Sequence, residues 1–112
     1  MPKYLTVSEP ATSELHILRS IFIAQLIPVD NEEMFKKFLA ETKAKHRQAS
    51  HHCYAYRIGI GNKEKIYYSD HGEPSGTAGK PILGVILKHN LTNTAIIISR
   101  YFGGKKLGIR GL

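Results

Sequence analysis

Residues 68–79 read Tyr-Ser-Asp-His-Gly-Glu-Pro-Ser-Gly-Thr-Ala-Gly, and Lys80 and Pro81 follow directly. An ordinary turn needs only a few glycine, proline or short polar residues, placed where the backbone takes a positive φ or where a helix is capped. This run is much longer and leads into an apolar segment. It therefore predicts a shaped loop that follows a strand, begins a helix and offers its backbone to a binding partner.

The segments on either side of this loop predict a hairpin, a helix and a central strand. Alternating apolar residues over Cys53–Ile60, a turn at Gly61-Asn62 and a return over Lys65–Ser69 are typical of an antiparallel hairpin. After the loop, a proline in the first turn favours a helix over Lys80–His89. The unbroken apolar run within Thr94–Arg100 is typical of a strand in the middle of a sheet.

The first part of the chain predicts one more strand and one more helix. Ile17–Ile27 is rich in apolar residues and stops at Pro28, which suits a strand. Asp30 and Glu33 match a capping pattern, and apolar residues at helical spacing continue from about Asn31 to His46. We expect residues 1–16 to form an N-terminal arm, and residues 17–112 to form a single domain.

The elements follow the order β-α-β-β-α-β, which predicts an α+β fold. We expect a two-layer sandwich in which both helices cover one face of a four-stranded mixed sheet. A chain of 112 residues is long enough to bury a core of this kind. The single cysteine, Cys53, excludes a disulfide framework and is expected to be a small buried hydrophobe in a reducing cytoplasm.

The chain is strongly basic. Sixteen Lys and Arg residues against nine Asp and Glu residues give a formal net charge of +7 and a pI near 9.6. Such an excess favours a polyanionic partner such as RNA, because neutralised phosphates release their counterions. The alternative is that the charge only keeps the protein soluble. The N-terminus has no apolar signal segment, and no apolar stretch is long enough to span a membrane, so no membrane partner is expected.

The glycine-rich loop does not match a nucleotide-binding motif. Pro74 and Pro81 stand where the Walker phosphate loop needs glycine and a hydroxyl residue, and Glu64 stands where a dinucleotide motif would need its third glycine. A loop that enters a helix N-terminus still attracts anions, because unpaired N–H groups point at the ligand. The candidate anion-binding residues are Asp70, Glu73, Ser75, Gly76, Thr77, Gly79 and Lys80. The alternative is a well-capped connection, in which Ser75 or Thr77 caps the helix.

Histidines and carboxylates do not combine into a metal or catalytic motif. The six histidines lack the spacings of zinc sites, and the side chains of His51 and His52 would point to opposite faces of a strand. Asp70 and Glu73 are three residues apart on a bent loop, which fixes no separation suited to general acid–base catalysis. No metal, cofactor or catalytic residue is therefore assigned, and the chain is not predicted to be an enzyme.

The last part of the chain predicts a nucleic-acid-binding segment. Arg100 follows the apolar strand, Tyr101 and Phe102 offer flat rings, and glycines alternate with positive charges beyond them. By strand alternation, one of the two aromatic side chains is expected to continue the core. Aromatic and basic residues interleaved with glycine suit single-stranded or looped RNA. The further candidates in this segment are Gly103, Gly104, Lys105, Lys106, Gly108 and Arg110.

Three segments, residues 50–57, 69–83 and 100–108, resemble the Impact N-terminal domain family, which includes YigZ-like bacterial proteins. The resemblance extends from Ile17 to Leu112 and includes His51 and His52 as motif residues. It implies a fold similar to the second domain of ribosomal protein S5 and to domain IV of elongation factor G. It also implies a role in translation, since eukaryotic Impact restrains an initiation-factor kinase by competing for that kinase's activator. The resemblance implies no catalytic reaction.

The chain departs from the family pattern in three places. His71 stands where the family commonly has a second aspartate, and Arg110 stands where it often has glycine. Family members also continue past the final Gly-Leu into an amphipathic helix that this sequence does not include. We therefore expect apolar side chains of Ile96–Ile98 and Tyr54–Ile60 to lack cover. Self-association through that sheet face, or a longer natural chain, would supply the cover; the N-terminal arm is the less favoured alternative.

Three functions are consistent with these features. The leading hypothesis is a translation-associated regulatory domain that binds RNA or the ribosome through its basic, glycine-rich segments. The second is an enzyme or binding protein for a phosphorylated small molecule, with the Gly72–Lys80 loop holding the phosphate. The third is a protein-interaction module that regulates a translation-linked kinase pathway.

Overall fold

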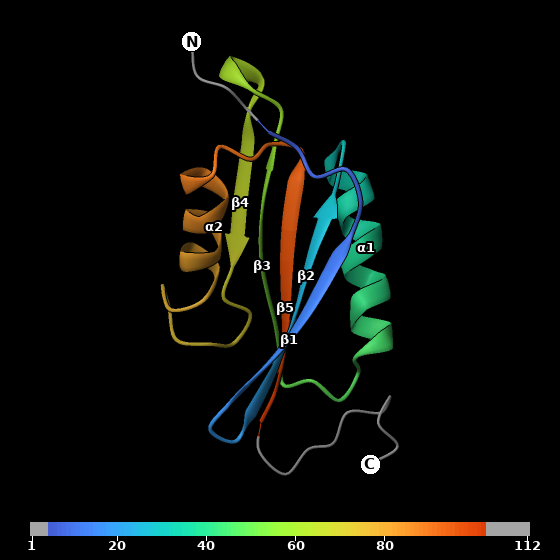
Figure 1. Cartoon of the computed structure of the whole chain (residues 1–112), viewed down its shortest axis with the longest axis vertical. Coiled ribbons are helices and arrows are strands. Elements are labelled where there is room, and N and C mark those ends of the chain that lie inside the picture. The colour runs from blue at the N-terminus through green and yellow to red at the C-terminus, as the bar shows by residue number, and fades with distance from the viewer. Residues whose placement is uncertain (1–4, 103–112) are drawn as a thin grey trace.

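The computed structural model describes residues 5–102, which form one five-stranded sheet with a helix packed on each face (Figure 1). The elements are β1 (Ala11–Ile17), β2 (Ser20–Pro28), α1 (Glu32–Lys45), β3 (His51–Ile58), the 3₁₀ turn η1 (Gly61–Lys63), β4 (Lys65–Ser69), α2 (Gly79–Lys88) and β5 (Thr94–Tyr101). The predicted α+β class and both predicted helices are confirmed.

The sheet has the strand order β1-β2-β5-β3-β4, and every pair of neighbouring strands is antiparallel. β5 lies in the middle of the sheet, as its continuous apolar run predicts, and the hairpin of β3 and β4 is also confirmed. The predicted count of four strands and the mixed sheet were wrong. The additional strand is β1, so the order of elements is β-β-α-β-β-α-β.

β5 explains why the two helices lie on opposite faces of the sheet. Successive side chains of a strand point to opposite faces. Ala95 and Ile97 pack in a cluster with α1, whereas Ile96 and Ile98 pack against the cluster that contains α2. Because β5 is apolar on both faces, each face needs its own cover. The expectation that both helices cover one face was therefore wrong.

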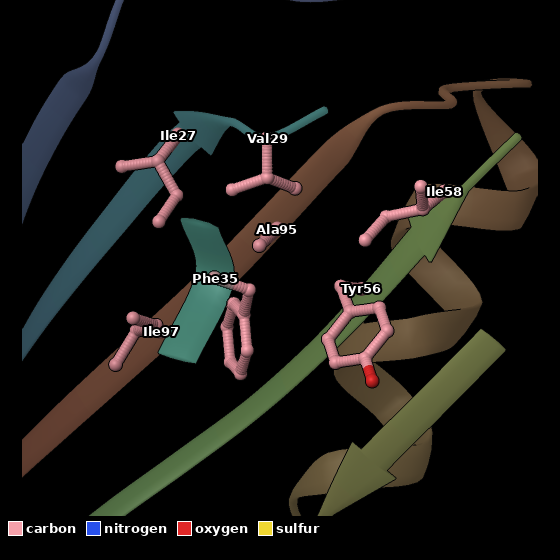
Figure 2. Packing of buried hydrophobic residues seen from close by; sticks show 7 residues of the cluster. All are labelled: Ile27, Val29, Phe35, Tyr56, Ile58, Ala95 and Ile97. Carbon is pink, nitrogen blue, oxygen red and sulfur yellow. The ribbon is translucent and has the colours of Figure 1, made fainter. Parts of the chain in front are cut away.

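The cluster beneath α1 is built from Ile27, Val29, Phe35, Tyr56, Ile58, Ala95 and Ile97 (Figure 2). α1 begins where Asn31 caps it, because the Asn31 side-chain oxygen accepts a hydrogen bond from the Met34 N–H at 2.8 Å. The observed helix lies within one residue of the predicted range at each end. The Asp30–Glu33 capping pattern was displaced by one residue, since the capping residue is Asn31.

β1 forms part of the segment predicted as an N-terminal arm. Its seven residues are all exposed, and it pairs with β2 through a tight turn at Leu18, where φ is 53°. Leu15 and Ile17 alternate with Glu14 and His16, a short strand pattern that the expectation of an arm overlooked. Nearer the N-terminus, Leu5 exchanges backbone hydrogen bonds with Asn90 and Thr92. The described part of the predicted arm thus extends the edge of the sheet.

α2 ends in the way that the His89-Asn90 pair predicts. Asn90 has a φ of 52°, its N–H donates to the Leu87 carbonyl, and the Leu91 N–H donates to the Ile86 carbonyl. This pair of bonds is the Schellman motif, which satisfies the last carbonyls of a helix. No helix among the described residues is long and apolar enough to cross a membrane.

Candidate functional site at one end of the sheet

The loop between β4 and α2 lies at the same end of the molecule as the end of β5 and the beginning of β3 (Figure 1). Arg100 of β5 donates to both carboxylate oxygens of Glu73 in the loop, each at 3.0 Å. His51 of β3 forms a hydrogen bond through Nδ1 with the carbonyl oxygen of His71 at 2.9 Å. The glycine-rich loop of residues 68–80 and the described start of the C-terminal segment, at Arg100, are therefore in direct contact.

Asp70 organises the loop. Its Oδ2 accepts a hydrogen bond from the Gly76 N–H at 2.9 Å, and its Oδ1 accepts from the N–H groups of Ala78 and Gly79 at 3.0 and 2.7 Å. These bonds from Gly76, Gly79 and Ala78 hold the pKa of the Asp70 carboxyl below its usual value. Asp70 is thus the cap of α2, reached from the far end of the loop.

The predicted capping residues do not bond the helix N-terminus. The N-cap residue, Ala78, makes no side-chain capping bond, and the Thr77 hydroxyl donates to the Pro74 carbonyl instead. Ser75 is exposed and lies before Gly76, where φ is 77°. A phosphate bound at this end of α2 would have to compete with Asp70 for the same N–H groups. The arrangement therefore favours a loop that caps α2 with its own side chain over a binding site for a small anion.

Asp70→Ala is expected to lower the melting temperature by several degrees and to loosen the loop, because three backbone N–H groups lose their shared acceptor. Amide hydrogen exchange should show faster exchange at Gly76, Ala78 and Gly79, ahead of global unfolding. Asp30→Ala is the matched control, since it removes an exposed carboxylate just before α1. Unchanged exchange at the three amides in Asp70→Ala would contradict the capping role.

Arg100 is fixed between two aromatic rings. Its guanidinium carbon lies 4.0 Å from the centre of the Phe102 ring and 5.2 Å from that of Phe22. Nε and Nη2 donate to the Ser20 hydroxyl at 3.3 Å, in addition to the two bonds that Nη1 makes with Glu73. The positive charge of Arg100 is therefore balanced within the protein.

Tyr101 and Phe102 point in different directions, as strand alternation predicts. Tyr101 is buried, and its hydroxyl hydrogen-bonds Nδ1 of His46 at 2.7 Å. Phe102 is 40% exposed and meets the His51 ring edge-on, with the ring centres 5.6 Å apart. Tyr101 is thus the residue of the pair that continues the core, while Phe102 remains at the surface.

A cavity of about 690 Å³ lies beside Arg100, between α2 and the strands β2 and β5. Its walls include Phe22, Ile82, Ile98 and Phe102. Cys53 also lines it, but burial raises the pKa of this thiol to about 11, and the thiol donates a hydrogen bond to the Asp70 carbonyl at 2.9 Å. A thiol held in its protonated form is a poor nucleophile, in agreement with its prediction as a buried hydrophobe.

A second cavity of about 380 Å³ lies on the same face of the sheet, where Ala24, Leu26, Val85 and Ile96 contribute to its walls. We call the two cavities together the apolar groove. The groove accounts for the part of the predicted uncovered face that Ile96 and Ile98 supply, whereas Ile97 is buried under α1. Tyr54, Tyr56 and Ile58 instead pack in the cluster with α1, so that part of the expectation was wrong. Self-association through the groove stays a prediction.

Histidines surround the beginning of β3. The His52 backbone N–H donates to Nδ1 of His71 at 3.0 Å, and Nδ1 of His52 hydrogen-bonds the Ser99 hydroxyl at 2.9 Å. Burial, together with the charges of His71 and Lys43, lowers the pKa of His52 to about 4. His52 is therefore a neutral core residue that holds the loop against β3. No group of three metal-ligating side chains occurs among residues 5–102.

The structure brings together only part of the predicted site. Asp70, Glu73, Gly76, Gly79 and Arg100 form one hydrogen-bonded unit, and Lys80 is exposed in the first turn of α2. Gly103, Gly104, Lys105, Lys106, Gly108 and Arg110 lie outside the described residues. The sequence reasoning missed Ser20 and Phe22, which contact Arg100 from β2. Only the pairing of β2 with β5 reveals them, and no local pattern encodes that pairing.

Comparisons with known proteins agree with this architecture. The family model described as the Impact N-terminal domain matches residues 18–112. The IMPACT family member YvyE of Bacillus subtilis is 44% identical over 109 residues, which are 97% of this chain and 50% of YvyE. The crystal structure of a hypothetical protein matches with a TM-score of 0.82 and 36% identity over 93% of this chain and 51% of that one.

A third similar protein carries a description of its role. The structure of the two-domain translational regulator Yih1 matches with a TM-score of 0.58 and 30% identity, covering 90% of this chain and 38% of that one. The chain spans about half the length of the bacterial relatives that it matches.

Proposed function

Because this chain belongs to the Impact N-terminal domain family, we propose that it is a translation-associated regulatory domain that binds RNA or the ribosome. The similarity to a translational regulator supports the first part of this proposal. The distribution of charge supports the second part. In this proposal the protein works in the cytoplasm and acts by binding.

The observation that carries RNA binding is a basic surface at the end of α1. Lys43, Lys45 and Arg47 are exposed there, and Lys45 and Arg47 border a shallow cavity together with Tyr101, the last residue of β5. In sequence, the glycine-rich basic segment with Lys105, Lys106 and Arg110 follows Tyr101 closely.

The acidic groups of the same end offset this basic surface only in part. Glu73 and Arg100 are paired and their charges cancel. Asp70 keeps its negative charge, and Glu41 lies one helical turn before Lys45. Positive charge at this end therefore remains available to a polyanion.

The two alternatives receive different support. An enzyme for phosphorylated substrates would need the N–H groups at the start of α2, but these are bonded to Asp70. The thiol of Cys53, which lines the adjoining cavity, is kept protonated. A protein-interaction module is more compatible with the structure, because the apolar groove offers a surface on which an apolar segment could pack.

We expect the protein to bind RNA with micromolar or tighter affinity that weakens as salt rises. Each phosphate contact should contribute about 0.7–0.9 to the slope of log affinity against log salt. Lys105→Ala/Lys106→Ala and Lys45→Ala/Arg47→Ala should therefore each reduce that slope by about 1.4–1.8. Fluorescence anisotropy with a labelled RNA at several salt concentrations measures both quantities.

Lys63→Ala/Lys88→Ala is the matched control for these double variants. It removes the same charge, but from η1 and the last turn of α2, at the opposite end of the molecule (Figure 1). The control should lose less affinity than either double variant. Equal losses in all three would show that net charge alone drives binding, and no measurable RNA binding would refute the proposed function.

A further inference from the structure

Three tyrosines form an aromatic strip on the α1 face of the sheet, beside the helix. Tyr67 of β4 pairs with Tyr56 of β3, and their ring centres are 5.9 Å apart with the planes inclined by 33°. The Tyr54 ring lies 6.0 Å from Tyr67 at an inclination of 32°. Tyr56 is 5% exposed, whereas Tyr67 is 52% exposed. The strip therefore passes from the core to the surface through rings of similar orientation.

The buried part of the strip is held in place by α1. The Phe35 ring of α1 lies 5.0 Å from Tyr54 and 4.7 Å from Tyr56. The Tyr56 hydroxyl donates to a Glu32 carboxylate oxygen at 2.5 Å, and Lys65 bonds the other oxygen at 3.2 Å. Tyr67 thus lies against a fixed aromatic base, and ordering its ring on binding costs little conformational entropy.

Lysines flank this strip along α1. Lys36 and Lys43 are exposed and separated by seven positions, which is two helical turns or about 10 Å along one side of the helix. The Tyr56 hydrogen bond is the main cause that lowers the pKa of Glu32, and the charges of Lys65 and Lys36 add to it. Lys43 adds to burial in lowering the pKa of His71. Lys36 follows Glu32 by one helical turn, and Glu32 bonds Tyr56 of β3 and Lys65 of β4. Lys43 lies two turns further along the same side of α1. Helical spacing therefore places both lysines on the side of α1 that faces β3 and β4.

We propose that this strip binds single-stranded RNA, with a base stacked on Tyr67 and the phosphate backbone running along Lys36 and Lys43. The inference rests on the function proposed above. It specifies which form of RNA is bound and which surface binds it. A flat ring beside a row of positive charges is complementary to an unpaired base and its phosphates. A duplex keeps its bases stacked inside, so it cannot place a base on the ring. Sequence reasoning did not identify Tyr67, whose position depends on the register of β3 and β4.

The experiment measures binding of a fluorescein-labelled oligouridylate of about twelve nucleotides. Tyr67→Ala is expected to weaken binding roughly 5- to 100-fold without changing the salt slope, because it removes stacking but no charge. Tyr67→Phe, which keeps the ring, should bind within about twofold of the native protein. Tyr68→Ala is the matched control: it is the next residue, it is 41% exposed, and it lies on the opposite face of the sheet.

The lysines are tested by a different measurement. Lys36→Ala/Lys43→Ala should reduce the salt slope for oligouridylate by about 1.4, the value for two phosphate contacts on a single strand.

Tyr67→Leu retains apolar bulk and provides a second ring-free variant in case Tyr67→Ala fails to fold. It is expected to bind as weakly as Tyr67→Ala does.

The outcomes separate this inference from the function on which it rests. Native affinity in both ring-free variants would overturn the strip as the RNA surface while leaving the proposed function intact. The same loss in Tyr68→Ala as in Tyr67→Ala would also overturn it. Tighter binding of an RNA duplex of equal length would assign the surface to phosphates alone. Failure of the native protein to bind any RNA would refute the proposed function itself.

Discussion

Gly79→Ala is expected to destabilise the protein by about 3 kcal/mol or more, a large part of the stability of a domain this size. An added Cβ at Gly79 would lie 2.7 Å from the Ser69 carbonyl oxygen and 2.8 Å from the backbone carbon and nitrogen of Ser69. Those atoms belong to the end of β4, and Gly79 begins α2 while its N–H donates to Asp70. Neither backbone segment can move without breaking the loop, so the contact between the added Cβ and Ser69 cannot be relieved by a small shift.

Gly84→Ala provides the matched control in the same helix. An added Cβ at Gly84 meets no atom within 4 Å, so the substitution should stabilise the protein by about 1 kcal/mol through helix propensity. Urea denaturation followed by circular dichroism measures both changes. A Gly79→Ala protein as stable as the native one would show that β4 and α2 are not held in this close contact.

The free energy of unfolding is expected to decrease as the pH falls from 6.5 to 4. His52 is buried, and burial is the main cause that lowers its pKa from 6.5 to about 4; the charges of His71 and Lys43 contribute further. In this window the unfolded chain binds a proton that the folded chain does not, so acid favours unfolding. The stabilisation is complete above pH 6.5. At about 1.4 kcal/mol per pH unit, the loss by pH 4 is at most about 3 kcal/mol.

His52→Asn tests the origin of this acid sensitivity. The asparagine amide keeps a polar group near the Ser99 hydroxyl but does not titrate. The variant should lose much of the dependence on pH, and the remainder should come from His46 and His71, whose pKa values burial also lowers. His89→Asn, at an exposed histidine, is the control and should behave like the native protein. Identical pH profiles for the native protein and His52→Asn would refute the assignment.

Local patterns predicted the elements of this fold well because their signals are contained in short segments. The period of the apolar residues and the proximity of a capping residue placed α1 within one residue at each end. The arrangement of the helices was not predictable in this way. An apolar run such as Thr94–Arg100 indicates burial on both faces, but it does not say which element covers each face. The strand β1 carries only a short alternation, with Leu15 and Ile17 on one face, and both side chains stay about half exposed, so burial could not reveal its pairing.

In the candidate site, too, the residues were predictable from the sequence but their contacts were not. The sequence identified Asp70, Glu73 and Arg100 as unusual residues, and the structure joins all three to one loop. Their roles were not predictable, because Asp70 caps a helix that begins nine residues later and Arg100 is 27 residues from Glu73. Capping rules cover only neighbouring positions. A carboxylate that bonds the backbone has the same sequence signature as one that binds a ligand.

The position of β5 fixes the order in which the chain can fold as it is synthesised. β5 lies between β2 and β3, although it follows both in the chain. The hairpins β1–β2 and β3–β4 involve neighbouring residues and can form early, but each leaves one strand edge unpaired until residues 94–101 emerge from the ribosome. Both apolar clusters also lack Ala95 to Ile98 until then. We therefore expect the sheet to close in one late step, and the nascent chain to be prone to aggregation before that step.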